Sequence, residues 1–267
     1  MFEEATLQFE TMDLSLNYDL GTPYKSSSQK ARVITEDWVE HNLYCPRCGN
    51  KMLCHYTANK PVADFYCEKC GSDFELKSQE RANDFSTKIV DGAYSTMIKR
   101  ITSLNNPHLF VMSYHNWEVT NFLFIPNYLF TYETIEKRKP LSPEAKRAGW
   151  TGCNILLDKI PQSGKIFIIK DSALEDKEKV LQQYERISVL RMNNLESRGW
   201  ILDVLKCIES LPEKDFCLQQ MYEFEEQLHE KYPNNNFIKD KIRQQLQILR
   251  DKQIIEFTSR GHYRSLI

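Results

Sequence analysis

The spacing of apolar residues changes along the chain and predicts helices and strands in turn. Residues 28–42 repeat apolar side chains at helical spacing, and another helix is predicted from about residue 92 to residue 103. Short apolar runs predict strands. These runs are residues 61–66, 73–78, 109–113, 120–125, 154–157 and 166–169. Strands interspersed with helices indicate a mixed α/β core.

The C-terminal third has a different pattern, which predicts three helices followed by a hairpin. The helices are residues 195–211, 216–231 and 237–252, and the hairpin strands are residues 254–257 and 262–264. Three helices and a β-wing indicate a winged-helix arrangement, a variant of the helix-turn-helix. We therefore predict two domains, residues 1–190 and residues 191–267.

The composition of the chain excludes several classes of protein. A length of 267 residues, a hydrophobic fraction of 41% and a net charge of −2 are ordinary for a soluble globular protein. No apolar run approaches the roughly 18 residues that span a bilayer, and residues 1–4 lack the pattern of a signal peptide. We expect a cytoplasmic protein without a membrane partner. The absence of G-x-G-x-x-G and Walker A patterns argues against a nucleotide-binding α/β enzyme.

The cysteines indicate a metal site. Eight cysteines in a cytoplasmic chain should be reduced, which favours metal binding over disulfides. Four of them form two C-x-x-C pairs, Cys45 with Cys48 and Cys67 with Cys70, at a spacing typical of a zinc site. A glycine after each pair lets the chain turn away tightly. Four thiolates leave no open position on the metal, so the zinc is expected to be structural. The alternative is two unrelated pairs of buried thiols.

The second cysteine pair separates two predicted strands that carry charged residues. Side chains alternate along a strand, so Glu75 and Lys77 share one face, and the cysteine turn would hold Asp64 level with them. Asp64, Glu75 and the Leu76 carbonyl would bind Mg²⁺ through hard oxygen ligands. Lys77 would orient or help deprotonate the attacking water and stabilise charge on a phosphate. The pattern alone is weak, because E-x-K triplets are common on solvated strands and Asp64 could simply pair with Lys77.

Several longer stretches of the chain carry a family resemblance. They are YKSSSQKARVITEDWV (24–39), YCPRCGN (44–50), PVADFYCEKC (61–70), FELKS (74–78), DGAY (91–94), KRKPLSPEAKRAGWTGCNI (137–155), ESRGW (196–200) and KIRQQLQILRDKQIIEF (241–257). In these stretches the chain resembles the DpnI-type methyl-directed restriction endonucleases, members of the PD-(D/E)xK nuclease superfamily. The resemblance places Asp64, Glu75 and Lys77 in the catalytic motif of that superfamily, with Ala63 where the motif name expects proline.

The resemblance also implies a fold, a substrate and a reaction. The fold would be a PD-(D/E)xK nuclease core with an embedded zinc site, followed by the winged helix. The reaction would be Mg²⁺-dependent cleavage of both strands of double-stranded DNA at adenine-methylated GATC. Trp150, beside Arg147 on a basic loop with flanking glycines, is the candidate sensor of methylated adenine, and a buried core tryptophan is the competing interpretation. Glu36 is a further candidate to approach the metal, although an exposed acidic helix face is the favoured interpretation.

The charge of the C-terminal end supports DNA binding. Residues 237–267 contain seven basic and three acidic residues, a net charge of +4 in a chain of −2. Lysine and arginine neutralise phosphates, while arginine and glutamine can read base edges in the major groove. The candidate residues of the third helix and the wing are Lys239, Lys241, Arg243, Gln244 and Arg260. The alternative is a solvated helix face on a domain that binds other proteins.

Two other functions remain open from the sequence. The first is a zinc-ribbon transcription regulator with a winged helix and no catalysis, in which Glu75 and Lys77 would be incidental. The second is a nuclease of the same superfamily whose cleavage does not depend on methylation. A monomer is expected in each case.

Overall fold

The computed structural model describes residues 12–57, 63–82, 85–103 and 105–267. Its largest sheet has seven strands in the order β1-β2-β3-β5-β6-β9-β10. These strands are β1 (Cys54–His55), β2 (Phe65–Tyr66), β3 (Asp73–Glu80), β5 (His108–His115), β6 (Glu118–Ile125), β9 (Ile166–Lys170) and β10 (Ala173–Leu174). Only β3 and β5 run parallel, and the other neighbours are antiparallel. The prediction of a mixed α/β fold is confirmed.

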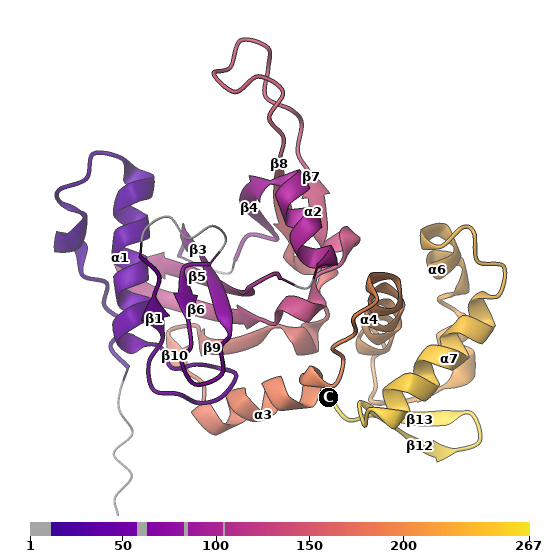
Figure 1. Cartoon of the computed structure of the whole chain (residues 1–267). Coiled ribbons are helices and arrows are strands. Elements are labelled where there is room, and N and C mark those ends of the chain that lie inside the picture. The colour runs from indigo at the N-terminus through magenta and orange to yellow at the C-terminus, as the bar shows by residue number, and fades with distance from the viewer. Residues whose placement is uncertain (1–11, 58–62, 83–84, 104) are drawn as a thin grey trace, which may run out of the picture.

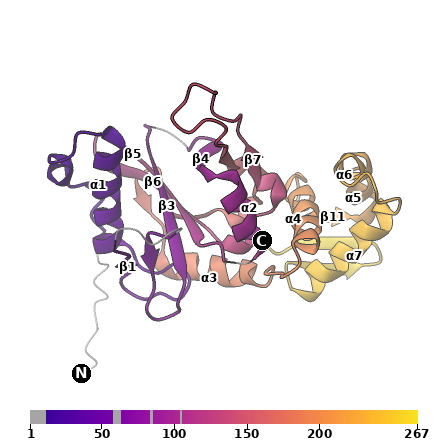
Figure 2. The same cartoon turned by 45° about the horizontal axis from the view of Figure 1, so that its top comes forward.

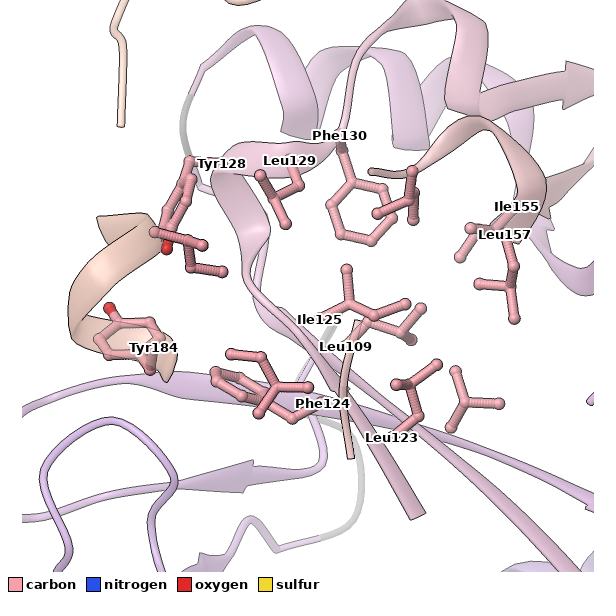
Figure 3. Close-up of a cluster of buried hydrophobic side chains, with 14 of the residues drawn as sticks. Leu109, Leu123, Phe124, Ile125, Tyr128, Leu129, Phe130, Ile155, Leu157 and Tyr184 are labelled. Atoms are coloured by element: carbon pink, nitrogen blue, oxygen red, sulfur yellow. The ribbon is translucent and has the colours of Figure 1, made fainter. Parts of the chain in front are cut away.

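Two helices cover the large sheet (Figures 1 and 2). Helix α1 (Ser27–Asn42) packs against β1 and β3, and α3 (Lys177–Ser188) packs against β9. Aromatic residues join these helices to the sheet, with Trp38 5.7 Å from Phe122 and Tyr184 5.7 Å from Phe124 between ring centroids. Figure 3 shows part of this apolar core, in which side chains of β5 and β6 meet those of the segment that follows β6. Helix α3 is not among the helices predicted above, although its buried positions follow helical spacing.

A second, smaller sheet lies beside the first and carries a helix. Its strands are β4 (Lys88–Ala93), β8 (Gly152–Leu156) and β7 (Ile135–Lys137), in the order β4-β8-β7, and α2 (Tyr94–Thr102) packs on it. The loop between β7 and β8 extends away from the body of the molecule (Figure 1). Short 3₁₀ helices complete this part of the chain. They are η1 (Tyr18–Gly21), η2 (Asn127–Leu129), η3 (Tyr132–Thr134), η4 (Leu157–Lys159) and η5 (Gln162–Gly164).

The C-terminal part has four helices and a three-stranded sheet among the residues that the structure describes. They are α4 (Leu195–Glu209), α5 (Leu218–Tyr222), α6 (Glu225–Lys231), α7 (Ile238–Asp251), β11 (Asp215–Cys217), β12 (Ile255–Ser259) and β13 (His262–Ser265), with sheet order β11-β13-β12. The predicted first and third helices and the hairpin are confirmed. The single helix predicted for 216–231 is wrong, because Phe216 pairs with Tyr263 in the sheet and the helical residues after it form two pieces.

A buried arginine ties the C-terminal part to the rest of the molecule. Arg198 of α4 is 1% exposed and donates hydrogen bonds to the carbonyl oxygens of Phe130 and Met192, at 3.0 and 2.9 Å. Lys231 of α6 forms ion pairs with Glu133 and with Asp203. No helix in the part of the chain that the structure describes is long and apolar enough to cross a membrane.

Candidate active site and cysteine cluster

The two cysteine pairs come together in one compact cluster. The sulfur atoms of Cys45, Cys48, Cys67 and Cys70 all lie within 4.8 Å of one another, and the closest pairs are 3.6 and 3.7 Å apart. Thiolates about 2.3 Å from a tetrahedral zinc would lie about 3.8 Å apart, so the cluster has the dimensions of a zinc site. Within the described ranges it is the only group of three or more histidines, cysteines or carboxylates close enough to hold a metal. The alternative of two unrelated thiol pairs is wrong.

The two turns that carry the cysteines repeat the same hydrogen bonds. In the first turn Asn50 O accepts from Cys45 N at 2.8 Å, and in the second Ser72 O accepts from Cys67 N at 2.9 Å. Gly49 and Gly71 follow the second cysteine of each pair with φ of +73° and +66°. Other residues rarely adopt this backbone conformation, which explains the glycine in each turn.

The second cysteine turn connects β2 to β3 and sets the position of Asp64. Pro61 and Val62 of the predicted strand 61–66 lie outside the described residues, and only Phe65 and Tyr66 are in strand conformation. Asp64 N donates to the Phe74 carbonyl oxygen of β3 at 2.9 Å, and the side-chain Oδ2 of Asp64 accepts from the Leu76 N–H at 2.8 Å. Asp64 is therefore fixed beside the strand residue that lies between Glu75 and Lys77.

Lys77 lies at the centre of a half-buried cluster of charges. Its Nζ is 2.7 Å from Glu75 Oε1 and 2.7 Å from Asp91 Oδ1. The other oxygen of Glu75 accepts from Arg100 Nη2 at 2.7 Å. The side chains of Glu75 and Lys77 are only 13% and 23% exposed, so the E-x-K triplet is not on a solvated face. We call Glu75, Lys77, Asp91 and Arg100 the lysine cluster. Lys77 pairs with Glu75 and Asp91 and forms no ion pair with Asp64 among the described residues, so the simple Asp64–Lys77 pair is not formed.

Burial and neighbouring charges shift the pKa values of Asp64 and Lys77. Burial raises the pKa of Asp64 against the hydrogen bond from Leu76, and the charge of Glu36 raises it further. Burial would lower the pKa of Lys77, but the charges of Glu75 and Asp91 outweigh it and the pKa is raised. Lys77 therefore holds its proton here and can donate a hydrogen bond to a developing negative charge. A buried carboxyl with another carboxylate beside it, such as Asp64, is a group that a divalent cation would stabilise.

Glu36 lies in this region instead of on an exposed acidic face. Its side chain is 12% exposed, and its two oxygens contact Arg32 Nε at 2.7 Å and His55 Nε2 at 3.1 Å. The interpretation of Glu36 as part of a solvated helix face is wrong, because α1 packs against β1 and β3 at this position. Glu36 is thus a half-buried carboxylate whose charge acts on Asp64.

Two members of the lysine cluster, Asp91 and Arg100, are not predicted from the sequence as site residues. Asp91 comes from β4 and Arg100 from α2, and both meet β3 only in the folded protein. Asp91 stands in the stretch 91–94 that contributes to the resemblance, and this was the available indication of its importance. Arg100 gave no such indication. Its Nε is buried and no described residue accepts from it, so the hydrogen bonding of the cluster is incomplete.

A family model described as the DpnI Dam-replacing family matches residues 12–193. The chain belongs to the Dam-replacing family. A second family model, described as the Dam-replacing HTH domain, matches residues 196–265. The resemblance to the DpnI-type methyl-directed endonucleases is thereby confirmed. The Dam-replacing family points to a methylation-dependent restriction endonuclease, a hydrolase with a helix-turn-helix domain for DNA.

The β7–β8 loop of this Dam-replacing protein presents Trp150 at its base. Trp150 is half-buried, and the Arg147 guanidinium lies 4.5 Å from its ring centroid. A Cβ atom at Gly152 would be 3.0 Å from the ring, so this glycine provides room for the indole. Trp150 is therefore neither a core residue nor fully exposed. Arg147 and the tip of the loop are exposed.

The candidate DNA-binding residues of the HTH domain do not share one free face. Lys241 Nζ lies 5.6 Å from the centroid of the Trp200 ring, against α4, and Lys239 pairs with Glu225 of α6 at 3.0 Å. Arg243, Gln244 and Arg260 are exposed. Arg243 donates to the Tyr222 hydroxyl, whereas Arg260 lies at the turn of the β12–β13 hairpin.

Proposed function

We propose that this protein is a type II restriction endonuclease that cleaves both strands of double-stranded DNA at adenine-methylated GATC. Membership of the Dam-replacing family supports the reaction class, and the methylated GATC sequence follows from the resemblance. We propose further that residues 1–190 form a PD-(D/E)xK catalytic domain, that residues 191–267 form a winged-helix domain, and that the protein acts as a monomer. The single observation that carries the catalytic assignment is the half-buried lysine cluster beside Asp64.

The metals of this proposal have suitable donors. Asp64 and Glu75 offer carboxylate oxygens and Leu76 a carbonyl oxygen, which are the hard ligands that Mg²⁺ prefers. Mg²⁺ held there would act as a Lewis acid on the scissile phosphate and lower the pKa of a bound water. The four cysteines would hold a structural Zn²⁺ and keep the β2–β3 hairpin rigid.

The residues of the lysine cluster have distinct roles in the proposed reaction. Lys77, protonated between two carboxylates, orients the attacking water and donates to the phosphate oxygen on which charge develops. Asp91 positions Lys77 together with Glu75. Arg100 holds the second oxygen of Glu75, which fixes the direction of the carboxylate.

Recognition of the methylated site is assigned to both parts of the chain. Trp150 and Arg147 on the β7–β8 loop are proposed to sense the methyl group of adenine. Arg243, Gln244 and Arg260 are proposed to contact DNA from the winged helix, with Lys239 and Lys241 adding positive charge.

A plasmid digest at low salt tests this proposal. Adenine-methylated and unmethylated plasmids are each incubated with the protein, once with Mg²⁺ and once with EDTA. Cutting of the methylated plasmid alone, with Mg²⁺ alone, is expected. Metal-dependent cutting of both plasmids would support a nuclease that does not depend on methylation. Binding without any cutting, by folded protein loaded with zinc, would favour the transcription regulator.

A variant of Asp64 tests the catalytic assignment separately. Asp64→Asn keeps the shape of the side chain but removes the charge that would hold the metal. We expect it to bind the methylated duplex as before and to lose cleavage. The control is Asp37→Asn, because Asp37 lies on α1 and pairs with His41 on the solvent side. Residual Mg²⁺-dependent cutting by Asp64→Asn would contradict the assignment.

A further inference from the structure

A polar cavity of about 330 Å³ lies apart from the lysine cluster. Its walls come from both cysteine turns, the start of β5, η2, α3 and the residues just after α3. His108 of β5 is paired with Phe74, whereas Glu75 and Lys77 project from the other face of β3. No step of the proposed reaction uses the residues of this cavity.

Two buried polar atoms of the cavity wall have no partner among the described residues. They are the hydroxyl of Tyr128, a residue that is 3% exposed, and Oδ1 of Asn106, a residue that is 6% exposed. Figure 3 shows the hydroxyl of Tyr128 directed toward that of Tyr184, across the space between η2 and α3. Buried polar groups are nearly always hydrogen-bonded. Two such atoms without a protein partner on one wall therefore indicate that a polar molecule in the cavity forms hydrogen bonds with them.

The cavity also has an excess of positive charge. Arg47 and Arg191 line it, and neither forms an ion pair with a carboxylate in the part of the chain that the structure describes. Among the described residues, Arg47 Nη1 donates to two neutral acceptors, Ser72 Oγ at 2.7 Å and Cys70 O at 3.3 Å. Two guanidinium groups without acidic partners favour an oxyanion ligand.

Hydrogen-bond acceptors in the same cavity restrict which oxyanions can bind there. Asp73 lines the wall with a carboxylate that accepts from the Tyr56 hydroxyl at 2.7 Å, and Asn106 offers a carbonyl oxygen. An anion bound beside these acceptors needs an O–H of its own. Hydrogen phosphate has one at neutral pH, whereas sulfate and the phosphodiester of a DNA backbone do not.

We infer that this cavity is a binding site for inorganic phosphate in its hydrogen phosphate form. Arg47 and Arg191 bind the ionised oxygens, Tyr128 donates a hydrogen bond, and Asn106 or Asp73 accepts the proton of the P–OH group. The site is separate from the proposed nuclease reaction and does not rest on it.

Binding is measured by titration calorimetry and thermal unfolding of the full chain loaded with zinc. Inorganic phosphate should raise the melting temperature in a saturable way, and sulfate at equal ionic strength should have a much smaller effect. Arg191→Gln should weaken phosphate binding about tenfold or more, since it removes a charged hydrogen-bond donor. The matched control is Arg186→Gln, an exposed arginine of α3 outside the cavity, which should bind phosphate as before.

A second variant addresses the unpartnered hydroxyl. Tyr128→Phe should weaken phosphate binding while raising the melting temperature without phosphate, because it removes a buried hydroxyl that has no partner there. No phosphate binding, equal effects of phosphate and sulfate, or unchanged binding in both variants would overturn the inference and leave a cavity filled by water. A loss of duplex binding in Arg191→Gln without any phosphate effect would overturn it in favour of a contact with the DNA backbone.

Discussion

The cysteine cluster and the lysine cluster share the β2–β3 hairpin but are assembled in different ways. Each pair of cysteines is held within a single turn, and the two turns repeat the same hydrogen bonds and the same glycine conformation. The lysine cluster takes its members from β3, β4 and α2, which meet only through the packing of two sheets. The first is therefore specified by local sequence and the second by the topology of the whole N-terminal part.

The largest effect is expected from damage to the cysteine cluster, because both clusters depend on the hairpin. Structural zinc contributes on the order of 10 kcal/mol in small zinc domains, so Cys67→Ser should lose zinc and unfold this region. Metal content, the thermal melt and plasmid cleavage should all fall together. The control Cys54→Ser lies on β1 outside the cluster and should keep zinc. Normal cleavage by Cys67→Ser would show that the lysine cluster does not depend on the cysteine cluster.

Damage to the lysine cluster should leave the cysteine cluster intact. Asp91→Asn removes one of the two carboxylates that position Lys77, and we expect cleavage to slow by about 10²- to 10³-fold. Zinc content should not change. The exposed Asp158→Asn serves as the control. Normal cleavage rates in Asp91→Asn would show that Lys77 needs no support from β4.

A smaller effect is expected for Glu36, whose charge acts on Asp64 without a direct contact in the described structure. Glu36→Gln should reduce cleavage about tenfold at low Mg²⁺, as expected for a modest change in local charge, and less at high Mg²⁺. Cleavage rates measured across a Mg²⁺ titration, with Asp37→Asn in parallel, separate these cases. An equal loss at every Mg²⁺ concentration would place Glu36 outside the metal region.

The smallest effect is expected for the pH dependence of the free energy of unfolding. His108 pairs with Phe74 where the hairpin joins β5, and its Nδ1 accepts from Asn127 N at 3.1 Å. Burial lowers the pKa of His108 to about 3, and the charges of Arg47 and Arg191 add to this shift. The folded state therefore binds fewer protons than the unfolded state below the ordinary value of 6.5. The stabilising contribution of neutral His108 is complete above pH 6.5 and is lost as the pH falls toward 3.

Chemical denaturation at several pH values measures this contribution. Between pH 6.5 and about pH 5.5 the free energy of unfolding should fall by about 1 kcal/mol from this residue alone. His108→Gln should flatten that part of the pH dependence. His115→Gln, at the exposed end of the same strand, should leave it unchanged. Metal analysis at each pH keeps this effect apart from loss of zinc.

The sequence predicted those parts of the site that depend on short-range spacing. The cysteine cluster, the position of Glu75 and Lys77 on one face of β3 and the turn that carries them followed from C-x-x-C spacing and strand alternation. Asp91 and Arg100 could not be found this way, because no local pattern states that β4 and α2 pack beside β3. The prediction of an exposed Glu36 is wrong for the same reason, since the burial of this residue depends on the packing of α1.

The fold shows the same division between local and distant effects. Long apolar runs such as β5, β6 and β9 and the helices α1, α4 and α7 were predicted close to their observed bounds. The prediction of a helix that begins at β11 is wrong, because the strand conformation of these residues depends on pairing with β13, far along the chain. The short strands β1, β7 and β10 have too few residues to show alternation.

The parallel pairing of β3 with β5 has a consequence for the order in which the protein forms during synthesis. The residues of the cysteine turns and the β2–β3 hairpin are synthesised before those of β5, which follow a few seconds later at about 5–20 residues per second. During that interval one edge of β3 has no neighbour, and such edges pair readily with other chains. Glu75, Lys77 and Glu80 place charges along this edge, which discourages such pairing. Charged side chains on β3 would therefore disfavour pairing of this edge with other chains until β5 joins the sheet.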